Sequence, residues 1–108
     1  MAENFKCDII SNEKDQITGL ELGGMLVMEN AQKLKDKLIG IADRLDHEVV
    51  ISVSELEEID LSNIQLLVAF ARRMTESEVS FRFEWNIDDD QKLLLEHVGI
   101  ANELLMKI

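Results

Sequence analysis

The sequence predicts a single α/β domain, in which a mixed, mostly parallel sheet of four to five strands is covered mainly on one face by three to four helices. Two observations favour this fold class. The chain has 108 residues, 46% of them hydrophobic, which suits one core and is too short for two. Strand-like and helix-like patterns follow the order strand, strand, helix, strand, helix, strand, helix, and right-handed crossovers through the helices make the later strands parallel.

The first two strands are expected to form a hairpin. They cover residues 5–10 and 16–22, and the polar residues 12–15 make the turn between them. Gly23 and Gly24 are expected to end the second strand. Cys7 alternates within the first strand and is expected to be a small buried side chain.

Apolar residues then recur at three- and four-residue spacing, which predicts a helix over about residues 30–45. The β-branched run at residues 49–53 has apolar side chains on both faces, which is typical of a central strand. A second helix is expected over residues 62–74. Its start has Ser62 and Gln65 at the spacing of a capping box, and Leu61 and Leu66 in the positions of a hydrophobic staple.

Residues 79–85 alternate strictly between large apolar and polar side chains, which predicts a strand with one buried face. A third helix is expected to open at residues 88–90, to run through Leu93, Leu94 and Val98, and to stop at Gly99. Residues 104–108 fit either an edge strand or a last helical turn.

The charge and the apolar runs exclude several classes of partner and location. With 22 acidic and 11 basic residues the net charge is −11, so binding to nucleic acid or to an anionic membrane surface is not expected. The longest apolar run, residues 66–71, is far shorter than the roughly 20 residues of a membrane-spanning helix. The first residues lack the pattern of a secretion signal, and the single cysteine excludes an intrachain disulfide, so we expect a cytoplasmic protein.

The sequence contains no recognisable catalytic or metal-binding set, so neither enzyme activity nor a cofactor is expected. His47 and His97 have no nucleophile at triad spacing, and no glycine-rich phosphate loop is present. The acidic run at residues 55–60 is expected to be a solvated loop rather than a metal site, because a linear run does not make oxygens converge on one cation. Residues 88–90 are explained by helix capping.

The most informative segment is the junction between the central strand and the second helix, because sites in such sheets collect where strand ends meet helix starts. Residues 49–64 resemble the central signature of STAS domains, in which a strand and a short loop lead to Asp-Ser-Ser-Gly-Leu at a helix start. Residues 24–31 are similar to the family's Gly-Glu-Leu-Asp-x-x-Asn-Ala element, and Gly99-Ile100 is similar to its later Gly-Leu pair. The resemblance covers nearly the whole chain in order and spacing.

This resemblance implies a STAS-like sandwich and a non-enzymatic module that binds other proteins. The best-known members are bacterial anti-sigma-factor antagonists. They capture an anti-sigma factor that is also a serine kinase, and they are released when it phosphorylates the serine at the helix start. By position Ser62 is that serine, and Asp60 is the acidic residue two before it. Other members are constitutive accessory subunits of membrane ATPases of the lipid-transport type. The partner-binding residues that the resemblance implies are Asp60, Leu61, Ser62, Asn63, Gln65, Met25, Val27 and Glu29.

The chain departs from the family pattern mainly on the surface around Ser62. The substituted positions are Leu61 for the first paired serine, Asn63 for a glycine, Gln65 for a small residue, and Val27 and Ser52 for aspartates. Two alternatives stay open. Ser62 is either only a helix cap, worth about 1 kcal/mol, or also a switch. The apolar residues 25–28 belong either to the core or to an exposed patch for a partner.

Overall fold

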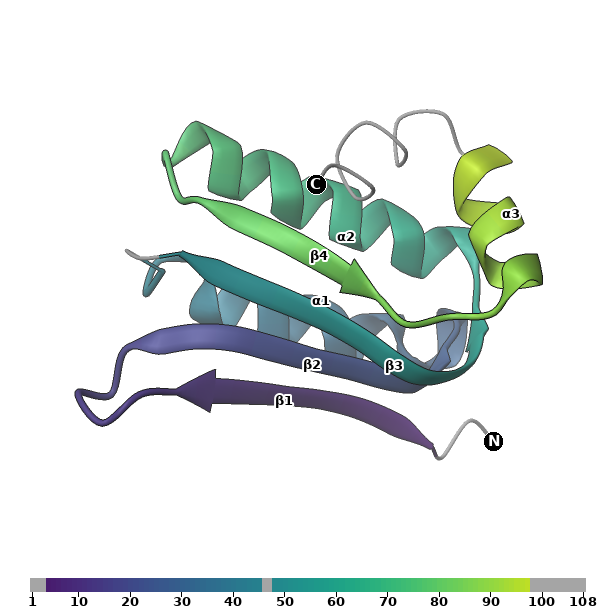
Figure 1. Cartoon of the computed structure of the whole chain (residues 1–108), viewed down its shortest axis with the longest axis horizontal. Coiled ribbons are helices and arrows are strands. Elements are labelled where there is room, and N and C mark those ends of the chain that lie inside the picture. The colour runs from purple at the N-terminus through teal and green to yellow at the C-terminus, as the bar shows by residue number, and fades with distance from the viewer. Residues whose placement is uncertain (1–3, 46–47, 98–108) are drawn as a thin grey trace.

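The computed structural model describes residues 4–45 and 48–97, and it confirms the α/β fold class and the order of the elements (Figure 1). Four strands form one mixed sheet, and three helices accompany it in the described part of the chain. The elements are β1 (Phe5–Ser11), β2 (Ile17–Leu26), α1 (Met28–Ala42), β3 (Val49–Ile59), α2 (Leu61–Glu76), β4 (Phe81–Trp85) and α3 (Asp89–His97).

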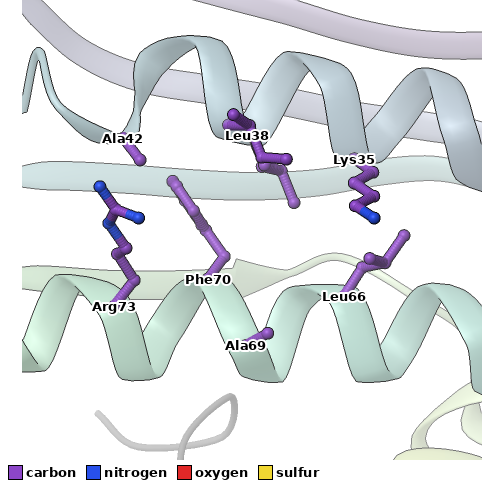
Figure 2. Close-up of a pocket in the computed structure, with 8 residues that line it drawn as sticks. Lys35, Leu38, Ala42, Leu66, Ala69, Phe70 and Arg73 are labelled. Atoms are coloured by element: carbon purple, nitrogen blue, oxygen red, sulfur yellow. The ribbon is translucent and has the colours of Figure 1, made fainter.

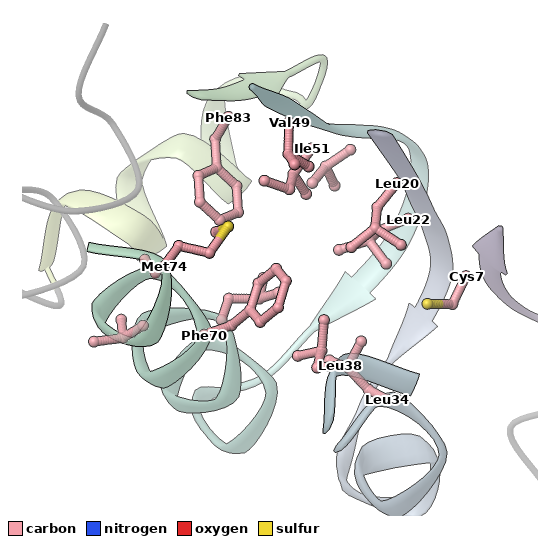
Figure 3. Packing of buried hydrophobic residues seen from close by; sticks show 14 of the residues in the cluster. Cys7, Leu20, Leu22, Leu34, Leu38, Val49, Ile51, Phe70, Met74 and Phe83 are labelled. Atoms are coloured by element: carbon pink, nitrogen blue, oxygen red, sulfur yellow. The ribbon is translucent and has the colours of Figure 1, made fainter. Parts of the chain in front are cut away.

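The sheet has the simple order β1-β2-β3-β4. β1 pairs with β2 as an antiparallel hairpin, whereas β2, β3 and β4 run parallel to one another. The two parallel pairs are connected by α1 and α2, which lie side by side on one face of the sheet (Figures 1 and 3). Consequently the starts of both helices follow the same end of the sheet, where β2 and β3 finish.

The core lies between the sheet and these two helices (Figure 3). The strand side chains that point toward α1 and α2 include Leu20, Leu22 and Ile51, all fully buried. Phe70 and Met74 of α2 close the core opposite β3 and β4. The other members of this core cluster are Cys7, Ile17, Leu26, Leu34, Leu38, Ile41, Leu45, Val49, Val53, Ile59, Ile64, Leu67, Val68, Ala71, Phe83 and Leu95.

The central strands are longer than the sequence suggested. Gly23 and Gly24 do not end β2. Gly24 has φ +73° and lies at a register shift, after which β2 continues to Leu26. β3 likewise passes through Glu55, which has φ +52°, and continues to Ile59 because its last residues pair with the end of β2. The expected acidic loop at residues 55–60 is therefore wrong: residues 55–59 belong to a strand, although the side chains of residues 55, 57 and 58 are exposed.

The helices also differ in detail from the prediction. α1 begins two residues earlier and ends at Ala42, and α3 turns Leu95 into the core while Leu93 and Leu94 remain exposed. Val98, Gly99 and residues 104–108 lie outside the described residues, as does His47. None of the described helices is both long enough and apolar enough to cross a membrane.

Candidate functional site

The candidate site is the place where α1 and α2 begin next to each other. The ends of β2 and β3 are tied together by the backbone N–H of Asp60, which donates to the carbonyl oxygen of Leu26 at 3.0 Å. One residue past Val27, the backbone N–H of Met28 donates to Oδ2 of Asp60 at 2.6 Å. The first turns of the two helices therefore share one carboxylate.

Asp60 caps both helices. It is the N-cap residue of α2, where its Oδ1 accepts the backbone N–H of Asn63 at 3.1 Å and the Ser62 hydroxyl at 2.6 Å. α1 has Val27 at its own N-cap, which provides no side-chain hydrogen bond. The bond to the N–H of Met28 supplies that missing cap from another element, so one side chain satisfies orphan donors of two helices.

The carboxyl group of Asp60 is held in its ionised form. Burial alone would raise its pKa, but hydrogen bonds from Ser62, Asn63 and Met28 outweigh burial and hold the pKa below the ordinary value of 3.8. The short Ser62–Asp60 contact fixes the direction of the hydroxyl, which points its hydrogen at the carboxylate.

The predicted capping box is wrong, because Ser62 lies inside the first turn of α2 and Asp60 takes the N-cap position. Asp60 takes the N-cap position because its side chain accepts the third helical N–H, that of Asn63. Its carbonyl oxygen also accepts the N–H of Ile64 at 3.1 Å. The hydrophobic-staple positions move accordingly to Ile59 and Ile64, which are both buried, and Leu61 is exposed instead.

The two helix starts match position by position, a relationship that sequence analysis missed. The first helical residues, Met28 and Leu61, are large apolar side chains that remain 73% and 51% exposed. The third helical residues, Asn30 and Asn63, are both buried. Asn30 donates its side-chain amide to the carbonyl oxygen of Met25 at 2.8 Å, and Asn63 donates its amide to Oδ1 of Asp60 at 3.0 Å.

The structure thus brings most of the predicted partner-binding residues to one edge of the molecule. Ser62 and Met25 are half-buried, and Leu61, Gln65 and Glu29 are exposed. Val27 and Asn63 offer no surface, because both are buried. The apolar stretch at residues 25–28 is divided: Leu26 and Val27 belong to the interior, whereas Met28, absent from the predicted set, is the exposed member.

From Ser62 a groove runs along the outer surface between α1 and α2. Its first part, about 260 Å³, is lined by Ser62, Gln65 and Leu66 of α2 together with Ala31, Gln32 and Lys35 of α1. A second part of about 240 Å³ continues between Leu38 and Phe70, with Lys35 and Arg73 as its charged lining (Figure 2). Arg73 forms an ion pair with Asp43, and the other lining residues are Ile39, Ala42, Leu66 and Ala69.

Within residues 4–45 and 48–97, no group of His, Cys, Asp and Glu side chains is placed to hold a metal ion. Cys7 of β1 is buried, and its burial raises the pKa of the thiol. The strongest chemical feature of the described surface is therefore the paired helix start around Asp60 and Ser62.

Comparison with known proteins agrees with this geometry. A family model described as "Mlab, STAS domain" matches residues 11–102, which include all the described strands except most of β1. A search of curated proteins found no match. The matched region carries the paired helix starts and the parallel strands β2, β3 and β4 with their two crossovers. The chain therefore belongs to the STAS domain family, whose members are generally regulatory modules that act by binding other proteins.

Proposed function

We propose that this protein is a non-enzymatic cytoplasmic regulator that captures a protein partner through the paired starts of α1 and α2, in the manner of an anti-sigma-factor antagonist. The observation that carries the proposal is the pair of exposed apolar side chains, Met28 and Leu61, on the two turns that Asp60 holds together. Large apolar side chains fixed on a rigid, polar-rimmed surface are typical of a protein contact.

Ser62 supports control by phosphorylation. Its hydroxyl lies in the first turn of α2 and is half-buried, next to the solvent-facing groove. The start of a helix tolerates a phosphate, because unpaired N–H groups and the positive end of the helix dipole face it. The equivalent second position of α1 already carries an acid, Glu29. We therefore expect phosphorylation to change the contact face and leave the fold intact.

The partner class that fits is an anti-sigma factor or a related ATP-binding serine kinase. A second candidate is a constitutive accessory subunit of a membrane ATPase of the lipid-transport type. Its support is that an exposed leucine, Leu61, stands where the family usually has the first of its paired serines. A permanently occupied interface favours apolar contact area of this kind.

The deciding experiment is intact-mass measurement of the protein purified from its native host, with and without phosphatase treatment. A phosphatase-sensitive adduct that maps to Ser62 supports the switch. A co-purifying kinase that binds the Ser62→Ala protein but not the Ser62→Asp protein would further support the switch, because a negative charge at position 62 then prevents binding. Absence of any adduct together with a co-purifying membrane ATPase overturns the antagonist role in favour of the accessory subunit.

A matched pair of variants tests the contact face itself. Leu61→Glu places a charge on the proposed face, and Ile10→Glu places one on the hairpin strand β1, at a side chain that is also exposed. Binding to the co-purifying partner should weaken at least about tenfold in Leu61→Glu and stay unchanged in Ile10→Glu. Equal affinities for the two variants would show that the partner binds elsewhere.

A further inference from the structure

The two oxygens of Asp60 are divided between the two helices. Oδ1 faces α2, where it accepts the Ser62 hydroxyl and both donors of Asn63, while Oδ2 accepts the N–H of Met28 at the start of α1. We infer that Asp60 is a positioning residue that transmits phosphorylation of Ser62 from the start of α2 to the start of α1. This inference rests on the proposed function, because it concerns how the Ser62 switch would act.

The chemistry of the modification removes the contact on which Asp60 depends. In the transfer, Oγ of Ser62 bonds to the γ-phosphorus of the kinase's ATP, the bond from that phosphorus to ADP breaks, and the hydroxyl proton is released. Oγ then has no hydrogen to donate, although it lay 2.6 Å from Oδ1 of Asp60. Two acceptor oxygens now face each other, and a group of about two negative charges lies beside an ionised carboxylate.

The carboxylate is the group that must yield. The backbone N–H of Asn63, which Oδ1 accepts at 3.1 Å, is the donor that a phosphate on Ser62 is best placed to take over at this helix start. Once Oδ1 loses the Ser62 hydroxyl and the backbone N–H of Asn63, only the side-chain amide of Asn63 still holds it on α2, and repulsion from the phosphate drives the group away. Rotation of Asp60 also carries Oδ2 away from Met28.

The start of α1 depends on this bond. Val27 at its N-cap makes no side-chain hydrogen bond, and the acceptor that the structure gives the Met28 N–H is Oδ2 of Asp60. The first turn of α1 therefore loosens when Ser62 is modified. Since Met28 is the exposed apolar residue of that turn, one phosphate alters both halves of the contact face.

Amide hydrogen exchange of the isolated full chain tests this coupling without any partner. Phosphoserine is incorporated at position 62 during synthesis, and exchange of the Met28 amide is followed by NMR. We expect it to speed up at least about tenfold, while the amide of the core residue Ile51 stays within about twofold. The control is Gln65→Glu, which adds a charge to the exposed side of the same helix and should leave Met28 within about twofold.

A second background separates coupling through Asp60 from a general effect of charge. Asn at position 60 can still accept from Asn63, but its amide nitrogen cannot accept the N–H of Met28. Asp60→Asn should therefore already show fast exchange at Met28, and phosphoserine 62 should add less than about twofold in that background. If Asp60→Asn does not fold, the comparison of phosphoserine 62 with Gln65→Glu decides alone.

Three outcomes overturn the inference. In the first, the Met28 amide still exchanges slowly in the phosphoserine protein, and in the second, the Ile51 amide speeds up as much as that of Met28. The third is that phosphoserine 62 accelerates Met28 equally in the parent and in Asp60→Asn. A different result contradicts the proposed function alone. If exchange of the Met28 amide speeds up with phosphoserine 62 but the affinity for the co-purifying partner does not change, the coupling through Asp60 holds and the proposed switch of partner binding does not.

Discussion

Asn30 and Asn63 occupy the same place in successive helices, as the buried third residue of α1 and of α2. Each donates its side-chain amide to an acceptor that precedes its own helix, the carbonyl oxygen of Met25 and the carboxylate of Asp60 respectively. The difference lies in the second acceptor. Only α2 has a side-chain cap of its own, and α1 borrows the same carboxylate through Met28. Stability of the two helix starts is therefore coupled.

Removal of the shared carboxylate should cost more than removal of an ordinary helix cap. Asp60→Ala is expected to lower the free energy of unfolding by about 2 to 4 kcal/mol, because it leaves both helix starts without their acceptor. Ser62→Ala removes a donor to Asp60 and a long contact, 3.4 Å, from the Asn63 side-chain amide, and should cost about 0.5 to 1 kcal/mol. The exposed neighbour Glu58→Ala is the control and should stay within about 0.5 kcal/mol of the parent in urea unfolding.

The same carboxylate should produce a defined pH dependence. Because the pKa of Asp60 is lower in the folded protein than in the unfolded chain, the ionised group stabilises the fold above about pH 4, and this contribution is lost as the pH falls through the folded pKa. Asp60→Asn has no such group. The difference in unfolding free energy between parent and Asp60→Asn should therefore be constant near neutral pH and shrink below about pH 4. A difference that is unchanged down to pH 2.5, measured by urea titration at about half-unit steps, would contradict this.

Substitution by alanine should change the stability of the domain in opposite directions at two of its glycines. Gly24 has φ +73°, and a Cβ there would lie 2.2 Å from the carbonyl oxygen of Asn4, so Gly24→Ala should destabilise the domain by about 2 to 4 kcal/mol. Gly40 lies within α1 and a Cβ there meets nothing within 4 Å. Gly40→Ala should therefore stabilise by about 0.5 to 1 kcal/mol, read as a higher midpoint in thermal unfolding.

The alternating strand β4 offers a test of its buried face. Phe83 is 6% exposed and lies between Phe81 and Trp85, with ring centroids 6.0 and 5.7 Å away. Phe83→Ala should cost about 3 to 5 kcal/mol in calorimetric or denaturant unfolding. Arg82 points to the other face and pairs with Glu48 and Glu84 only at the exposed surface, so Arg82→Ala should change stability by less than about 1 kcal/mol. Equal losses would mean that the strand faces the other way.

The fold was predictable because its signals are local. The alternation around Phe83 and the helical spacing of residues such as Leu34 and Leu38 report directly on which side chains are buried. The extensions of β2 and β3 were not predictable, since Gly24 and Glu55 adopt positive φ and stay in the sheet only because another strand pairs beside them.

The candidate site was predictable in place and only partly in detail. Family resemblance located the junction at Ser62, but Asp60 and Ser62 are both good cap residues two positions apart, and local sequence does not rank them. The structure shows Asp60 to be the cap, because the N–H groups of Met28 and Asn63 both donate to its carboxylate. Exposure of Met28 was missed for a similar reason, because an apolar residue that follows the buried Leu26 and Val27 looks like core until the helix start turns it outward.

The shared cap also sets an order of events during synthesis. The acceptor for the first turn of α1 is Asp60, 32 residues downstream of Met28. While the ribosome is adding the residues between them, the first turn of α1 lacks this acceptor, and Val27 at its N-cap supplies none. The first turn of α1 is completed only after β3 has emerged and paired with β2. The N-terminal half of the domain therefore finishes folding after its central strand has been synthesised.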